Sequence, residues 1–247
     1  MNRPVPFGGR LCAVLVVLGS SLAFGAAAAF GATAYAASSA CGLPVQVTTS
    51  AGSRQACGVD VRNFTLTAQV LSSPGAEARL AFHSDGALKG YQILFYNGPA
   101  DGTRKTGSLA HVRNLYRAQS ADGETFAFEL SVREKNIEVK VAGQTVVCYT
   151  EPAHPWRTPG HAGQLLAHGD FVFLGVKGRV AFTNISLTPL ADGVTNPADT
   201  LPPVDEQTDP VIRKQQIDFP VIDYHVHLKG GLTKELAHAK SLNYGIN

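Results

Sequence analysis

The sequence predicts an antiparallel β-sandwich over residues 60–190. Apolar and polar residues alternate with a period of two, Gly, Pro and Asn turns separate the alternating runs, and no run has a convincing helical period. Successive side chains of a strand point to opposite faces of a sheet, so such alternation buries one face and exposes the other. The 247 residues are enough for one substantial core or two modest ones.

The expected strands follow one another at short intervals along this region. In chain order they are 64–70, 80–82, 90–96, 126–132, 137–141, 145–149, 171–176 and 180–187. The run 126–132 has the clearest alternation, with Phe126, Phe128, Leu130 and Val132 on one side. Residues 151–170 interrupt the pattern with Pro, Gly and His and indicate a long loop.

Residues 1–36 are typical of a secretory signal peptide. Arg3 and Arg10 precede an apolar, Ala-rich stretch, and Ala34-Tyr35-Ala36 fits the rule for signal-peptidase cleavage. We therefore expect export to the periplasm or the extracellular space, with membrane contact only through this segment. The alternative is an uncleaved anchor, but Gly19 and the Ala-rich tail make a poor transmembrane span.

Charge and cysteine content restrict the possible partners. The 21 Lys and Arg include two in residues 1–36, which hold none of the 19 Asp and Glu, so the mature chain is formally neutral. A neutral chain without a basic stripe argues against a nucleic-acid partner. Export permits a disulfide, for which Cys41 and Cys57 are the natural pair, whereas Cys148 is expected to be a buried apolar thiol.

The segments on either side of the sandwich have a different character. Residues 37–59 lead into it, and 191–217 are expected to form a proline-containing linker that buries little apolar surface. Residues 218–247 indicate one further strand–loop–helix unit. Its helix is expected over 232–240, with Thr233 as the N-cap.

Two histidines in this last unit have metal-ligand spacing. His225 and His227 follow the apolar run 219–222, and on a strand positions i and i+2 share a face. Imidazole is a common ligand for zinc and similar metals, but zinc takes three or four protein ligands. We expect a divalent metal here only in a complete barrel with further ligands, and no cofactor is certain for the sandwich.

The sandwich region resembles the 3-keto-disaccharide hydrolase domain family, a concanavalin-like jelly roll. The resemblance rests on Phe64-Thr65-Leu66, Gly90-Tyr91-Gln92-Ile93, Gly107-Ser108-Leu109, the hairpin 137–147 and the strand 180–185. It implies hydrolysis or lyase chemistry on 3-keto-glycosides by exported proteins. The family's usual Gly-Tyr-Glu is Gly90-Tyr91-Gln92 here, so one acidic side chain is absent, which favours binding over hydrolysis.

The C-terminal unit, with Asp223 before His225 and His227, is similar to the first strand of an amidohydrolase or PHP-type metallo-hydrolase barrel. There an Asp-x-His-x-His element supplies two metal ligands at the C-terminal end of the strand. The resemblance implies that residues 218–247 are the truncated start of such a barrel.

Seven polar or aromatic side chains are candidates for contact with a sugar. Tyr91 and Gln92 alternate on one strand, so they cannot face the same ligand, and ordinary packing is the alternative for each. Trp156 either stacks on a sugar ring or plugs the sandwich edge. The full set is His83, Tyr91, Gln92, Tyr96, His111, Arg113 and Trp156.

Three functions are compatible with the sequence. The leading one is an exported carbohydrate-active hydrolase that acts on the glycosidic bond of a glycan or 3-keto-glycoside. The alternative is a non-catalytic carbohydrate-binding module that targets an attached metal-dependent hydrolase, of which 218–247 is the start. The third is a truncated product without activity of its own.

Overall fold

A computed structural model describes residues 43–85, 89–98, 104–193, 201–216 and 233–246. The predicted signal peptide, Cys41 and the segment with His225 and His227 lie outside these residues, so the predictions made for them are untested.

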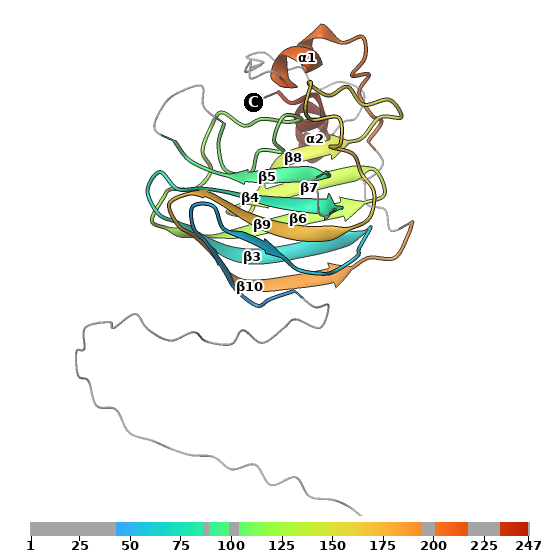
Figure 1. Cartoon of the computed structure of the whole chain (residues 1–247). Coiled ribbons are helices and arrows are strands. Elements are labelled where there is room, and N and C mark those ends of the chain that lie inside the picture. Colours follow the sequence, from blue (N-terminus) through green and yellow to red (C-terminus); the bar gives the residue numbers. More distant parts are fainter. Residues whose placement is uncertain (1–42, 86–88, 99–103, 194–200, 217–232, 247) are drawn as a thin grey trace, which may run out of the picture. The chain divides into compact units, whose positions relative to one another are not determined.

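The described residues form two antiparallel sheets that lie face to face (Figure 1). The six-stranded sheet contains, in spatial order, β1 (Val47–Thr49), β10 (Val180–Pro189), β3 (Phe64–Ser72), β6 (Thr125–Arg133), β7 (Asn136–Val141) and β8 (Gln144–Thr150). The four-stranded sheet contains β2 (Arg54–Ala56), β9 (Asp170–Lys177), β4 (Glu77–Ser84) and β5 (Tyr91–Phe95). The predicted antiparallel sandwich is confirmed, and each expected strand of 60–190 is present.

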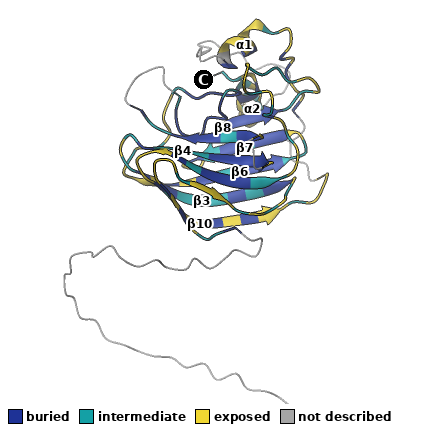
Figure 2. Cartoon of the chain, viewed as in Figure 1, coloured by how far each residue is buried: buried dark blue, intermediate teal, exposed yellow. Residues whose placement is uncertain are grey.

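The strands of both sheets are largely buried, as their dark-blue colour in Figure 2 shows. The core between the sheets is rich in phenylalanine. Phe182 of β10 packs edge-on against Phe95 of β5 and Phe173 of β9, with ring centroids 4.8 and 5.0 Å apart. These contacts cross from one sheet to the other. Full burial of a side chain of this size contributes about 1.5–3 kcal/mol, so the predicted alternation translates directly into stability.

Gly90 begins β5 at a point where the backbone of β4 is very close. Its φ is +101°, and a Cβ at this position would lie 2.3 Å from the Phe82 carbonyl oxygen. Any other residue would therefore clash with backbone as well as adopt an unfavourable conformation. The glycine thus fixes the start of the strand that carries Tyr91 and Gln92.

The sandwich begins earlier than the sequence predicts. Strands β1 and β2 lie in the expected lead-in 37–59, and Val47 of β1 is buried opposite Phe182. Each has three residues, which is too short to show alternation. Cys57 is half-buried, and its predicted disulfide partner Cys41 lies outside the described residues, so that pairing stays a prediction. Burial and the Asp170 carboxylate raise the pKa of Cys57 to about 12.

Part of the expected linker is folded against the sandwich. Leu201, Val204 and Ile212 are buried, and Pro210–Gln216 forms the short helix α1. Helix α2 (Lys234–Tyr244) packs beside β8 (Figure 1), and Thr233 caps it by accepting a hydrogen bond from Leu236 N, as predicted. Neither of these described helices has the length and apolar character needed to cross a membrane.

Candidate functional site

Tyr91 lies in a buried hydrogen-bond network and not on an open face. Its hydroxyl donates to Glu151 Oε2 and accepts a hydrogen bond of 2.6 Å from Arg157 Nη2. The same Arg157 nitrogen donates to the Tyr149 hydroxyl at 3.0 Å. Burial raises the pKa of Tyr91, so its hydroxyl keeps the proton that it donates. Tyr91 therefore has a structural role here.

Arg113 belongs to the same network through Glu206, a residue of the segment expected to be a linker. Glu206 Oε1 lies 3.3 Å from Arg113 Nη1, and Oε2 lies 2.8 Å from Arg157 Nη1. Arg113 Nε also donates to the Asn243 carbonyl of α2 at 2.7 Å. Two guanidinium groups of the sandwich thus hold both C-terminal segments in place.

His83 is a buried structural residue near the end of β4. Its Nε2 donates to the Arg62 carbonyl at 2.9 Å, and Nδ1 accepts from Ala167 N at 3.3 Å. Burial lowers the pKa of His83 to about 4, so the ring is neutral in the folded protein. Both nitrogens are used to hold neighbouring segments, which leaves none for a ligand.

The neutral His83 predicts that stability falls on acidification. In the unfolded chain His83 binds a proton below pH 6.5, its ordinary pKa. In the folded chain it binds that proton only at about pH 4. The free energy of unfolding should therefore decrease by up to about 3 kcal/mol between pH 7 and pH 4 from this group. Urea unfolding across this range measures it, with His83→Asn as comparison because Asn tolerates the left-handed backbone. Equal pH slopes in the two proteins would contradict the assignment.

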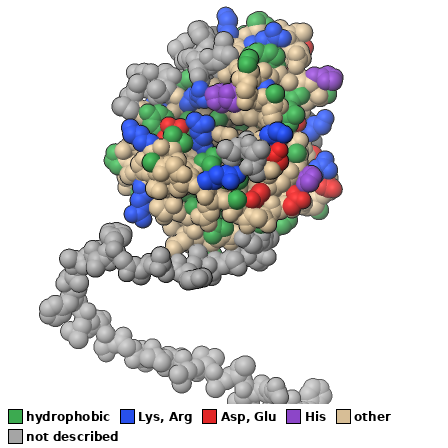
Figure 3. Space-filling model, viewed as in Figure 1, with side chains coloured by type: hydrophobic (Ala, Val, Ile, Leu, Met, Phe, Trp, Pro, Cys, Tyr) green, Lys and Arg blue, Asp and Glu red, His purple; other side chains and the backbone are tan. Residues whose placement is uncertain are grey.

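The outer face of the four-stranded sheet carries Gln92, on the side of β5 opposite to Tyr91. Arg79 of β4 donates to Gln92 Oε1 at 3.3 Å and to Glu77 Oε1 at 3.2 Å. A hollow of about 350 Å³ opens here, lined by Arg54, Arg79, Gln92 and the backbone around Gly175. Figure 3 shows Lys and Arg side chains distributed over the face turned to the viewer, with Asp, Glu and His side chains among them.

Two loops bring a pair of stacked histidines close to Arg79. The segment 104–116 runs along β5, where Ala110 N donates to the Gln92 carbonyl at 2.9 Å. The loop 151–170 is held by Gly90 N, which donates to the Gly163 carbonyl at 2.8 Å. As a result the rings of His111 and His161 stack with centroids 3.7 Å apart.

The two histidines differ in what they can do. Arg104 Nη1 donates to His111 Nε2 at 3.1 Å, which occupies that lone pair. His161 Nδ1 lies 2.8 Å from the Thr158 hydroxyl, which orients the ring. In the tautomer in which Nδ1 donates to that hydroxyl, Nε2 is the nitrogen that can take a proton. Partial burial, then Arg104 and Arg79, lowers the pKa of His161 below its ordinary value, so it is a neutral base at pH 7.

The remaining two candidates lie apart from this group. Tyr96 follows β5 on the Gln92 side, where its backbone N–H bonds the Thr106 hydroxyl at 2.9 Å. Trp156 lines a different hollow, of about 520 Å³, and its ring faces the Arg213 guanidinium of α1 at 5.5 Å. Of the two alternatives for Trp156, this contact favours closure of the sandwich edge.

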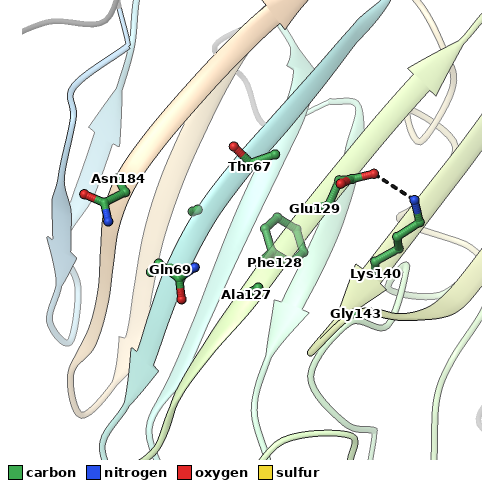
Figure 4. A pocket seen from close by; sticks show the side chains of 9 residues that line it. Thr67, Gln69, Ala127, Phe128, Glu129, Lys140, Gly143 and Asn184 are labelled. Atoms are coloured by element: carbon green, nitrogen blue, oxygen red, sulfur yellow. Dashed lines mark hydrogen bonds and ion pairs between the residues drawn. The ribbon is translucent and has the colours of Figure 1, made fainter.

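A third hollow, of about 310 Å³, lies on the outer face of the six-stranded sheet (Figure 4). Gln69 of β3 faces the small Ala127 of β6 in register, and the longer side chains of Thr67, Glu129 and Lys140 surround this low point. Lys140 Nζ pairs with Glu129 at 2.9 Å and lies 3.7 Å from Glu138. The charged side chains that line this hollow are therefore paired with each other.

Residues 45–188 match the family described as the 3-keto-α-glucoside-1,2-lyase-like domain. Because this match covers more than half of the chain, the protein belongs to that family, which gives it a carbohydrate-related function. No curated protein sequence matches the chain. Among the described residues, no three side chains of His, Cys, Asp or Glu lie together in a way that could hold a metal ion.

Two solved structures illustrate the shared fold. A Parabacteroides distasonis protein provisionally described as a glycosyl hydrolase is similar with a TM-score of 0.51 at 11% identity, over 59% of this chain and 81% of that one. The carbohydrate binding module CBM66 from Bacillus subtilis reaches a TM-score of 0.41 at 13% identity, over 57% and 84%. The two antiparallel sheets and the match to the Parabacteroides distasonis structure confirm the predicted jelly-roll sandwich.

Proposed function

We propose that the sandwich binds a 3-keto-glycoside on the outer face of its four-stranded sheet and cleaves the glycosidic bond. The observation that carries this proposal is the placement of a neutral imidazole, His161, beside the guanidinium groups of Arg79 and Arg104. Family membership supports the substrate class. The predicted signal peptide adds the proposal that this occurs outside the cytoplasm.

The chemistry requires a base and a stabiliser of negative charge. A carbonyl at C3 acidifies the proton on C2, which His161 Nε2 would remove. The electron pair passes through an enolate, whose oxygen a guanidinium stabilises, and then forms the C1–C2 double bond as the C1–O bond breaks. The departing oxygen takes a proton from the imidazolium. Addition of water to the double bond would complete a net hydrolysis.

A non-catalytic binding module is the second candidate function. Glu77 shares Arg79 with Gln92, and it is already paired with that guanidinium at 3.2 Å. Hydrolysis by two opposed carboxylates would need a second acid across the hollow. A face of this composition binds a sugar through Gln92 and Arg79 without acid catalysis, and an attached hydrolase would then supply the reaction.

Incubation of the full chain with a 3-keto-disaccharide and with its unoxidised parent separates the two functions. We expect product release from the keto sugar alone, unchanged by a chelator, because the proposed steps rely on His161 and the guanidinium groups. Calorimetry on the same samples measures binding. Binding heat without product from either sugar would refute cleavage and support the module.

A further inference from the structure

The loop 151–170, which carries His161, is held in place by contacts with other parts of the chain. Its described backbone hydrogen bonds to itself span two or three residues each, as from His161 N to the Thr158 carbonyl at 3.0 Å and from Gln164 N to the His161 carbonyl at 2.9 Å. Turns of this size shape a loop but do not attach it to a sheet. Besides the bond from Gly90 N, its attachment depends on side chains.

Arg157 closes the turn that contains His161 and attaches it to both sheets. Its Nε donates to the Gln164 carbonyl at 2.8 Å, so a residue before the histidine bonds one after it. Its Nη2 donates to the hydroxyls of Tyr91 and Tyr149 at 2.6 and 3.0 Å. Tyr91 belongs to β5 and Tyr149 to β8, one strand of each sheet. Arg157, which is 3% exposed, is therefore a buried link between the loop and the sandwich.

Glu206 holds this link from the C-terminal segment 201–216. Its Oε2 accepts from Arg157 Nη1 at 2.8 Å and from Trp156 N at 3.1 Å. The next residue, Gln207, donates from its side-chain amide to the His154 carbonyl at 2.9 Å. The C-terminal segment thus bonds the loop on the side that precedes the stacked histidine.

The geometry at Arg157 requires a guanidinium and not only a positive charge. The second hydrogen of Nη1 is donated to the Trp156 carbonyl at 2.7 Å. A guanidinium has five N–H donors in a fixed plane, and here each of them has an acceptor. Lysine offers three donors on one nitrogen. It could stay beside Glu206, but it could not bond the Gln164 carbonyl and the two tyrosine hydroxyls as well.

We propose that Arg157 is a positioning residue for His161, and that Glu206 makes the C-terminal segment 201–216 part of the same site. The inference rests on the proposed function for the role of His161 as the base. It adds that the reacting face and the C-terminal segment are coupled, because a change that displaces Glu206 also displaces the turn of the base. Arg157 itself contacts no sugar, since its guanidinium is buried and its five donors are in use.

Two properties of the full chain test this coupling without any substrate. Partial burial, then Arg104 and Arg79, keeps the pKa of His161 below 6.5 in the unmodified protein. Arg157→Lys keeps the positive charge but should loosen the turn, so the ring gains solvent and its pKa should rise toward 6.5. Histidine NMR titration measures this shift, with His161→Gln to assign the signal. Amide exchange of 161–166 should also become faster.

Activity then separates positioning from stability. In Arg157→Lys, kcat for a 3-keto-disaccharide should fall about 10–10²-fold with KM little changed, because a displaced base affects the transition state more than binding. Arg113→Lys is the matched control. Arg113 is 2% exposed and shares Glu206, but its described partners lie outside the loop 151–170. This variant should lose stability and keep both kcat and the pKa of His161. Thermal unfolding midpoints show which variants fold.

Glu206→Gln is a second variant, which answers the question if Arg157→Lys does not fold. Loss of a carboxylate by charge alone lowers the pKa of a nearby histidine, so a rise in the pKa of His161 must come from the loosened turn. An unchanged pKa and unchanged exchange in these variants, or the same changes in Arg113→Lys, would overturn the inference. If the unmodified protein cleaves no 3-keto-disaccharide but the expected pKa shift is found, the proposed function fails and the positioning of the loop stands.

Discussion

Replacing Glu206 with alanine is expected to lower the free energy of unfolding by about 3–5 kcal/mol. The side chains of Glu206, Arg113 and Arg157 are 0%, 2% and 3% exposed. Removal of the carboxylate leaves the buried Arg113 without its acid and Arg157 with Glu151 alone, at 3.9 Å. A buried charge that loses its partner is destabilising because its desolvation is no longer compensated. Chemical unfolding of the full chain at pH 7 measures the change.

Two comparisons identify the cause of this loss. Glu206→Gln keeps the shape and one acceptor, so it should be less harmful than alanine if hydrogen bonding accounts for part of the effect. Glu129→Ala breaks a pair with Lys140 whose side chains are about one-third exposed, and such pairs contribute under about 1 kcal/mol. A loss for Glu206→Ala no larger than that for Glu129→Ala would show that the network does not hold the C-terminal segment.

The sequence predicts the strands well where a long run alternates and poorly where contacts are few or charged. Buried apolar residues alternate with outward-facing ones from Phe126 to Val132, so the sequence predicts β6 at the right place. Strand β1 depends instead on its pairing with β10, which no local pattern reveals. The segment 201–216 has the composition of a linker. It is held on the sandwich by a buried acid, Glu206, and acidic residues are ordinarily expected at the surface, so the sequence does not reveal this contact.

The candidate site is only half predictable for a similar reason. Gln92 is found because β5 alternates, whereas Arg79 becomes a site residue only through its antiparallel pairing with β5. The pairing of β4 with β5, together with the outward position of Gln92, is the signal that could have identified Arg79. His161 lies in a loop without a period, and its place depends on the bond between Gly90 N and the Gly163 carbonyl. Tyr91 was equally prominent in the sequence, yet it points into the core.

His161→Gln is expected to reduce kcat/KM for a 3-keto-disaccharide by about 10²–10⁴, the usual contribution of a general base. Binding of the unoxidised disaccharide should change little, because glutamine keeps polar atoms on the same face. His168→Gln is the matched control, since His168 is 72% exposed and pairs with Asp60, away from the stacked pair. That variant should cleave at the rate of the unmodified protein.

The pH dependence distinguishes a base from a residue that only shapes the loop. Burial and the nearby Arg104 and Arg79 lower the pKa of His161, so the imidazole is neutral throughout the range above pH 6.5. kcat/KM should therefore be level near neutral pH and fall on acidification through a pKa below 6.5, as the base becomes protonated. In His161→Gln this acidic limb should disappear from the residual activity. An unchanged limb, or activity within about threefold of the unmodified protein, would assign the proton transfer to another group.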